Sequence, residues 1–242
     1  MKSTLLDKSF RILEKIALSR EPVTLKELAS DLELNTSTVS RITSDLTERN
    51  LIRKSGYHSF VPSIGLFRIG NAAGDTPLIR AVSGVMEERL TEMGVNGVFA
   101  GIDGGYIVHM YEKMIDQTSW MPSRLPVWKS NLAALLLGKR NDQEMIERFF
   151  YNTWKGDRKD AATLRECELL RRRCAEAAEA GHVVFKDPRL GWSISFPVEV
   201  SGELYGISIF GKDIENSKLE LLEFECSRLA SKLSSVLGEL FY

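Results

Sequence analysis

Residues 24–58 of this 242-residue chain read TLKELASDLELNTSTVSRITSDLTERNLIRKSGYH. This stretch decides the fold of the N-terminal part. It opens on Thr24, and Glu27 follows three residues later, ahead of a run with apolar residues at helical spacing. That spacing is the signature of a capping box, in which the threonine and the glutamate satisfy each other's backbone N–H groups. We therefore predict a short helix over residues 25–32.

A second helix and a hairpin follow within the same stretch. Asn35 or Thr36 caps the helix, which we expect to continue to about Asn50. The turn at residues 55–58 then separates two short strands, the second of which ends near Val61. Two short helices joined by a turn of about three residues and followed by a basic hairpin predict a winged helix-turn-helix.

Residues on both sides of the turn supply the apolar contacts that such a motif needs. A preceding helix over residues 4–19 carries one apolar stripe, and residues 20–22 end it. The next helix offers Leu28, Ala29 and Leu32 to the core. In the third helix the side chains that lie together at helical spacing are Val39, Ile42 and Leu46.

The opposite side of the third helix is polar and is the predicted DNA-reading surface. Its short hydroxyl side chains allow close approach to a groove, and Arg41 can reach a guanine edge or a phosphate. Lys54 and His58 lie on the hairpin, where an adjacent backbone or minor groove would be. The candidate DNA-binding residues are Thr24, Thr36, Ser37, Thr38, Ser40, Arg41, Ser44, Lys54 and His58.

Glu33 is an unusual residue at the turn between the two helices. Glycine often occupies this position because the backbone there adopts a left-handed conformation. A residue with a side chain costs about 1–2 kcal/mol in that conformation. Either the turn is remodelled or the chain carries this strain.

The second half of the sequence predicts an antiparallel sheet with flanking helices. Strand-like segments at residues 97–102 and 106–113 are joined by Asp103-Gly104-Gly105, a strong hairpin signal. Two further strands are expected at 192–200 and 203–210. The expected helices cover residues 79–93, 130–137, 142–150, 161–180 and 217–240. The fold class is therefore α+β, with a DNA-binding domain at residues 1–62, a linker at 63–78 that is partly helical, and a sensor-like domain at 79–242.

Charge and composition agree with a DNA-binding front half. Residues 1–75 contain 11 Lys/Arg and 9 Asp/Glu, a net charge of +2, while the remaining 21 and 24 give −3. This excess is too small for tight phosphate binding by one copy, so we expect a dimer or tetramer to add its contacts together. No run is long and apolar enough for a membrane span, and the N-terminus does not read as a signal peptide. With an odd number of cysteines, we expect a cytoplasmic protein.

The chain from Leu5 to Gly74 resembles the N-terminal region of IclR-type transcription regulators. The matching stretches are SFRIL at residues 9–13, LKELA at 25–29, STVSR at 37–41 and IGLFRIG at 64–70. Downstream, the segments at 181–183, 196–198 and 206–211 are similar to the family's C-terminal domain. The resemblance implies dimers through the DNA-binding half, often tetramers, and a GAF-like domain that binds a small organic acid or related metabolite.

The resemblance also implies an effector pocket, although this sequence departs from the family's pocket stretch. Trp128 stands where the family has His, Asn131 replaces a small residue, and residues 133–134 are Ala-Ala instead of Gly-Lys. Tryptophans can stack on a ligand ring, and Arg124 or Lys129 is a possible counter-ion for a carboxylate. The candidate effector-binding residues are Trp120, Trp128, Ser130, Asn131, Asp187, Ser193, Ser195 and Ser208.

Other classes of function have less support in the sequence. The three histidines lie in different predicted elements with no nucleophile motif beside them, so no enzyme is expected. Cys167 and Cys174 are two helical turns apart, too far for one tetrahedral ion, so we expect buried thiols and no metal or cofactor. We predict a DNA-binding regulator, a repressor rather than an activator, whose operator binding responds to an organic or sugar acid. The alternative is a regulator with a degenerate pocket that acts through oligomerisation or a protein partner.

Overall fold

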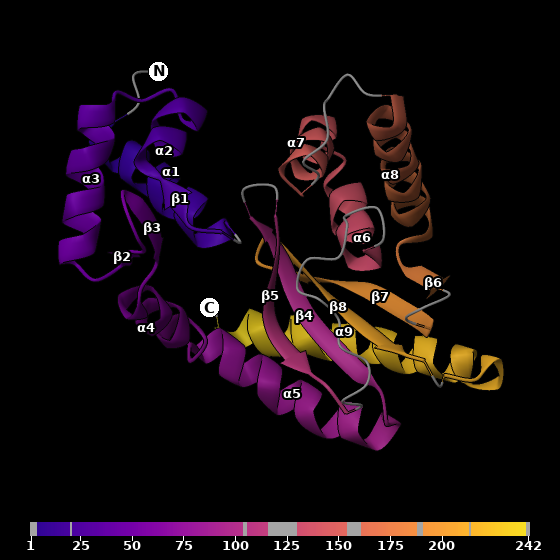
Figure 1. Cartoon of the computed structure of the whole chain (residues 1–242). Helices are drawn as coiled ribbons and strands as arrows, with labels where there is room; N and C mark the ends of the chain where they lie inside the picture. The colour runs from indigo at the N-terminus through magenta and orange to yellow at the C-terminus, as the bar shows by residue number, and fades with distance from the viewer. Residues whose placement is uncertain are drawn as a thin grey trace. The chain divides into compact units, whose positions relative to one another are not determined.

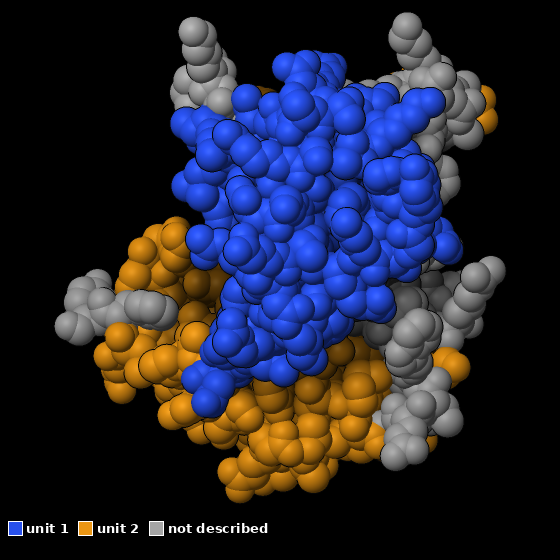
Figure 2. Space-filling model, turned by 60° about the vertical axis from the view of Figure 1, so that its left-hand side comes forward, with its two compact units in different colours: residues 1–75 blue, residues 76–242 orange. Residues whose placement is uncertain are grey.

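A computed structural model describes residues 4–19, 21–103, 106–115, 130–153, 161–187, 191–212 and 214–240. The backbone contacts divide the chain into two compact units, Met1–Asp75 and Thr76–Tyr242, which Figure 2 shows in different colours. Both units combine helices with antiparallel strands, so the predicted α+β class is confirmed (Figure 1).

The first unit is a three-helix cluster with a small sheet and a fourth helix. Its elements are α1 (Leu5–Leu18), β1 (Val23–Thr24), α2 (Leu25–Asp31), α3 (Thr36–Glu48), β2 (Ile52–Lys54), β3 (Ser59–Pro62) and α4 (Ile64–Ala73). The sheet order is β1-β3-β2, so the predicted hairpin has a third strand that the sequence analysis did not anticipate. The segment predicted to be partly helical forms α4.

The prediction that the third helix continues to Asn50 was too long by two residues. The helix ends at Glu48 because Asn50 adopts a left-handed conformation, with φ of 59°. The N–H of Leu51 then bonds the carbonyl of Leu46 at 2.9 Å, which satisfies a carbonyl at the helix end. Asparagine tolerates this conformation better than most residues, and that local preference stops the helix.

The second unit places a single sheet between two layers of helices. Its elements are α5 (Pro77–Met93), β4 (Asn96–Asp103), β5 (Tyr106–Lys113), α6 (Asn131–Arg140), α7 (Gln143–Thr153), α8 (Ala161–Ala180), β6 (Val183–Asp187), β7 (Gly191–Val200), β8 (Glu203–Gly211), a 3₁₀ turn (Asn216–Lys218) and α9 (Leu219–Leu240). The five strands are antiparallel to their neighbours in the order β5-β4-β8-β7-β6.

The two faces of this sheet bury different side chains. Phe99, Ile194 and Ile207 belong to the cluster that packs with α5 and α9, whereas Val98 and Phe210 belong to the cluster that packs with α6, α7 and α8. Alternation along each strand produces this division, since successive side chains point to opposite faces. Figure 1 shows α5 and α9 on one side of the sheet and α6 to α8 on the other.

Strand β6 was not predicted. Residues 183–187 read Val-Val-Phe-Lys-Asp, with no alternation of polar and apolar residues, and they follow directly on α8. The segment becomes a strand because it pairs along β7, with Val183 opposite Ser195 and Asp187 opposite Gly191. A short edge strand of this kind depends on its partner and leaves little local signal.

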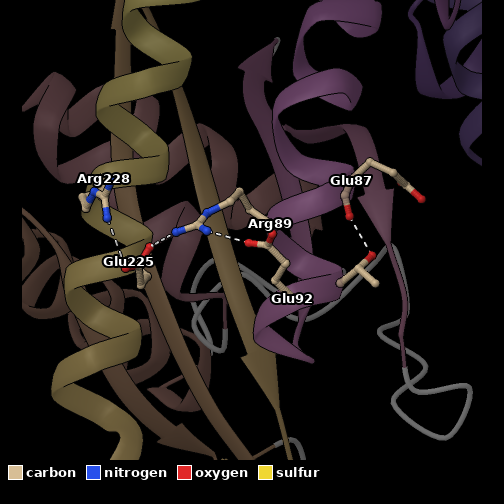
Figure 3. A network of polar contacts seen from close by, with 6 residues as sticks. Glu87, Arg89, Glu92, Glu225 and Arg228 are labelled. Carbon is tan, nitrogen blue, oxygen red and sulfur yellow. Dashed lines mark hydrogen bonds and ion pairs between the residues drawn. The ribbon is translucent and has the colours of Figure 1, made fainter.

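Ionic contacts join α5 to α9 beside the sheet. Arg89 of α5 contacts Glu92 on its own helix and Glu225 on α9, each at 2.5 Å, and Glu225 also contacts Arg228 at 3.4 Å (Figure 3). The two carboxylates hydrogen bond to the Arg89 guanidinium and raise its pKa. These charges are partly exposed, so we expect them to orient the helices more than to stabilise the fold.

Candidate nucleic-acid interface and effector site

Helices α1, α2 and α3 pack around one apolar cluster, and Lys15 of α1 also forms an ion pair with Asp31 of α2 at 2.5 Å. Leu28 of α2 and Val39 and Ile42 of α3 are buried, and they join Ile12 and Ile16 of α1 in one cluster. Burial of each such side chain contributes about 1.5–3 kcal/mol. Because these residues fix the inward side of α3, they also determine which side chains α3 presents to solvent.

The capping box at the start of α2 forms as predicted. The Thr24 hydroxyl accepts a hydrogen bond from the Glu27 N–H at 3.2 Å and donates one to the Glu27 carboxylate at 2.8 Å. The Thr24 N–H donates to the same carboxylate at 2.7 Å, and these bonds lower the pKa of Glu27. Thr24 is therefore engaged in the cap, and a DNA contact from its hydroxyl would compete with these bonds.

The turn between α2 and α3 keeps the left-handed conformation. Glu33 has a φ of 54°, the N–H of Glu33 bonds Ser30, and the N–H of Leu34 bonds Ala29. This pair of hydrogen bonds is a Schellman motif, in which the residue at the Glu33 position is usually glycine. The turn is thus not remodelled, and the chain carries the strain.

The exposed side of α3 presents four of the candidate DNA-binding residues together. Ser37, Ser40, Arg41 and Ser44 are all exposed. At about 100° per residue they fall on one face of the helix, opposite the buried residues. Two other candidates lie on this helix. Thr36 is the first residue of α3 and is exposed, and Thr38 is half-buried at the border of the face.

The hairpin carries the remaining candidates, Lys54 and His58, and both are exposed. The N–H of Ser55 bonds the carbonyl of Ser59 at 2.9 Å and closes the hairpin. The N–H of Leu25 bonds the carbonyl of His58 at 3.0 Å, which ties the hairpin to the start of α2. The wing is therefore held against the helix pair that positions α3.

Tyr57 is a wing residue that the sequence analysis did not single out. Its side chain is 90% exposed at the tip, between Gly56 and His58, which both have positive φ. The His58 ring packs edge-on against the Tyr57 ring, with the centroids 4.1 Å apart. The signal for Tyr57 in the sequence was an aromatic residue between a glycine and a histidine in a basic hairpin.

The candidate effector residues fall partly outside the described residues. Trp120, Trp128 and the possible counter-ions Arg124 and Lys129 lie in residues 116–129, which the structure does not describe. For Asp187 the backbone alone is described, at the end of β6 opposite Gly191. Ser130 caps α6, and its hydroxyl accepts the Ala133 N–H at 3.2 Å.

The structure brings the three candidate serines together on the sheet face that α6 to α8 cover. Ser195 of β7 lies opposite Ser208 of β8 and donates a hydrogen bond to it at 2.9 Å, while the Ser193 and Ser208 hydroxyls are 3.1 Å apart. Ser195 and Ser208 are buried. This contact was not predictable from the sequence, because it depends on the register of β7 against β8.

Asn131 has a partner that was not predicted from the sequence. It is buried at the first residue of α6, and its side-chain oxygen accepts a hydrogen bond from Arg173 of α8. The Arg173 guanidinium lies over the Phe185 ring of β6 at 4.9 Å. Arg173 is one of three successive arginines, and only the packing of α8 distinguishes it from the two others.

The described residues do not bring together a metal-binding group. His58, His109 and His182 lie in the wing, in β5 and between α8 and β6, and within the described ranges no three His, Cys, Asp or Glu residues are placed to hold a metal ion. All three cysteines are buried, and burial raises the pKa of Cys174 to about 12. No described helix is long and apolar enough to cross a membrane.

The first unit is similar to a known DNA-binding domain. The IclR helix-turn-helix domain matches residues 5–56, which agrees with the expectation of a DNA-binding regulator and not an enzyme. No curated protein matches the chain.

Solved structures of the IclR family are similar to the chain over nearly its whole length. An IclR family transcriptional regulator from Brucella abortus has a TM-score of 0.76 and 17% identity, and covers 96% of this chain and 91% of its own. An IclR homolog from Microbacterium hydrocarbonoxydans complexed with 4-hydroxybenzoate has a TM-score of 0.63 and 18% identity over 97% and 99%. Thermotoga maritima IclR has a TM-score of 0.56 and 18% identity over 96% and 98%.

The chain therefore contains an IclR helix-turn-helix domain, and as a whole it has the fold of IclR-family transcription regulators.

Proposed function

We propose that this protein is a cytoplasmic transcription regulator that binds operator DNA through α3 and the wing. The single observation that carries the proposal is the exposed polar face of α3, where Arg41 lies among three serines. Short hydroxyl side chains let a helix lie deep in the major groove, and an arginine among them can read guanine or contact a phosphate. The IclR helix-turn-helix match supports the same assignment.

The test begins with selection of genomic fragments that the purified full chain binds. The affinity for a selected fragment is then measured for wild type and Arg41→Ala at several salt concentrations. A base contact by Arg41 is worth about 1–3 kcal/mol, so we expect about 5- to 150-fold weaker binding. Arg172→Ala is the matched control because it removes the same charge from an exposed position on α8. Complete absence of salt-dependent DNA binding by wild type would overturn the proposal.

We also propose that the protein binds DNA as a homodimer or a dimer of dimers. Large apolar side chains are exposed on α1 and α4 of the first unit: Leu5, Leu6 and Phe10 on α1, and Ile64, Phe67 and Ile69 on α4. Exposed apolar residues at this density on a small unit support a protein–protein interface. A symmetric dimer predicts a near-palindromic operator with half-sites about one helical turn apart or a multiple of it.

Sedimentation of Phe67→Glu tests this interface. A charge at this exposed position on α4 should weaken dimers and lower operator affinity, while the folded monomer keeps its far-ultraviolet circular dichroism. Glu48→Gln at the end of α3 is the control for a change of charge outside the apolar surface. A wild-type chain that sediments as a monomer at the concentrations that bind DNA would contradict the dimer.

We further propose that a small organic or sugar acid modulates DNA binding and that the regulator represses transcription. The cluster of Ser193, Ser195 and Ser208 supports a polar site in an otherwise apolar face. The Microbacterium homolog complexed with 4-hydroxybenzoate supports a carboxylic acid. Deletion of the gene should raise transcription beside the selected sites, and lowered transcription there would indicate an activator.

A further inference from the structure

Tyr57 is the most exposed of the large apolar side chains that the structure describes. Its side chain is 90% exposed in the turn between β2 and β3, whereas the next in rank, Ile64, is 69% exposed. Single exposed apolar residues are common on protein surfaces. Tyr57 differs from them because it lies at the tip of the wing, residues 52–62, and because both its backbone and its ring are held in place.

The turn that carries this ring is fixed on both sides. The N–H of Ser55 bonds the carbonyl of Ser59 at 2.9 Å, the Ser59 hydroxyl donates to the Ser55 carbonyl, and the His58 carbonyl accepts the Leu25 N–H at 3.0 Å. Gly56 and His58 have φ of 81° and 53°. A left-handed histidine is uncommon and persists where the surrounding structure enforces it. In this conformation the His58 ring packs edge-on against the tyrosine ring, with the centroids 4.1 Å apart. The wing therefore holds an aromatic ring in place without burying it.

Two cations lie on the wing beside the tip. Arg53 and Lys54 are successive exposed residues of β2, and successive side chains of a strand point to opposite faces. The wing contains these two cations and no Asp or Glu. A hairpin with a positive charge on each face suits a groove that has a phosphate backbone on each side.

The dimensions of the minor groove admit the tip of the wing but not its strands. Paired strands are about 4.8 Å apart before their side chains are counted, and the minor groove of DNA is about 6 Å wide and 7.5 Å deep. A single side chain at the tip can therefore enter where the hairpin itself cannot, and Tyr57 is that side chain. Its hydroxyl can donate to adenine N3 or thymine O2, whereas the guanine amino group presents a competing donor.

We propose that Tyr57 enters the minor groove beside the half-site that α3 reads and inserts at a TA step, while Arg53 and Lys54 contact the phosphates on either side. A TA step has no guanine amino group and is among the steps that kink most easily. Side chains that insert at a base step partly unstack it and kink the duplex by about 20–90°. The inference rests on the proposed function and goes further, because it assigns the wing a sequence preference of its own.

The experiment uses the full chain and a selected genomic fragment whose flanking base pairs are randomised. We expect wild type to enrich a TA step at a fixed distance from each half-site, and replacement of that step by CG to weaken binding about fivefold or more. Tyr57→Ala should lose both the enrichment and this difference but keep its discrimination among half-site sequences. Tyr57→Phe keeps the ring and should lose only part of the preference. Because the side chain is exposed, circular dichroism should show both variants folded.

Two further measurements separate the ring from the charges. With 2-aminopurine in place of the adenine of the TA step, wild type should raise the fluorescence by unstacking the base, and Tyr57→Ala should not. Arg53→Gln and Lys54→Gln should each lower the slope of log affinity against log salt by about 0.9 and leave the TA preference intact. Arg172→Gln is the matched control for the loss of an exposed arginine charge, since it lies on α8, and it should leave the slope unchanged.

The results distinguish this inference from the proposed function. Wild type that binds its selected DNA without preferring any flanking step, or a folded Tyr57→Ala that keeps the TA preference, overturns the role of Tyr57 and leaves α3 as the reading helix. Weaker binding by Arg53→Gln and Lys54→Gln with unchanged binding by Tyr57→Ala means that the wing contacts only the DNA backbone, which also overturns it. Failure of wild type to bind any DNA overturns the regulator itself.

Discussion

Replacing Glu33 by glycine should stabilise the first unit. Glu33 has a φ of 54° at the Schellman turn that ends α2. A left-handed conformation costs a residue with a side chain about 1–2 kcal/mol. Glycine avoids that cost but loses about 0.5–1 kcal/mol more backbone entropy on folding. The net gain lies between about 0 and 1.5 kcal/mol, which for a domain of this size corresponds to a rise in Tm of up to about 12 °C.

The two units can be followed separately in one unfolding experiment. All four tryptophans lie after residue 75, so tryptophan fluorescence reports on the second unit and far-ultraviolet circular dichroism on both. Glu33→Gly should shift the circular dichroism transition of the first unit and leave the fluorescence transition in place. Glu14→Gly, an exposed position inside α1, is the control and should destabilise by about 1 kcal/mol. A loss of stability in Glu33→Gly would refute the strain at this turn.

Three further changes test other parts of the structure. Gly65→Ala should destabilise the first unit by about 1–3 kcal/mol, because the added Cβ would lie 2.4 Å from the Asn50 carbonyl oxygen. Denaturant unfolding measures this loss in the free energy of unfolding. Tyr57→Ala should weaken binding to a selected DNA fragment and leave Tm unchanged, since the side chain is exposed; equal affinity would exclude a wing-tip contact. Burial and a hydrogen bond to Glu87 raise the pKa of Tyr111 to about 12. Because this folded-state pKa lies above the unfolded value of 10, the stability Tyr111 contributes is present below pH 10 and is lost as pH rises towards 12. Unfolding of Tyr111→Phe should lack that part of the pH dependence.

The sequence predicted the first unit closely because its signals are local. The capping box joins Thr24 to Glu27, only three positions apart, and the buried set of α3 follows from helical spacing alone. Even the strained turn was visible, since glycine is the usual residue at the position of Glu33. Whether the turn would relax was not visible, because that depends on hydrogen bonds from Leu34 back to Ala29.

The second unit was predicted less completely because its important contacts join distant residues. Strand β6 exists through its pairing with β7 and has no pattern of its own. Asn131 and Arg173 are 42 residues apart, so their contact depends on how α6 crosses α8. The resemblance predicted Asn131 as an effector residue, but nothing in the run Arg171-Arg172-Arg173 indicated that Arg173 is the arginine that contacts it.

The crossing of α6 and α8 determines the geometry of the candidate effector site. A Cβ on Gly138 of α6 would lie 2.1 Å from the Cys174 carbonyl oxygen, so the two helices approach as closely as their backbones allow. Such a contact holds the helices in one relative position, because interiors packed at this density resist small displacements. Arg173 directly precedes Cys174, and its bond to Asn131 therefore joins residues whose backbones are already fixed. We therefore expect the adjustable part of the proposed effector site to be the side-chain layer between α8 and the sheet, where the Arg173 guanidinium covers the half-exposed ring of Phe185.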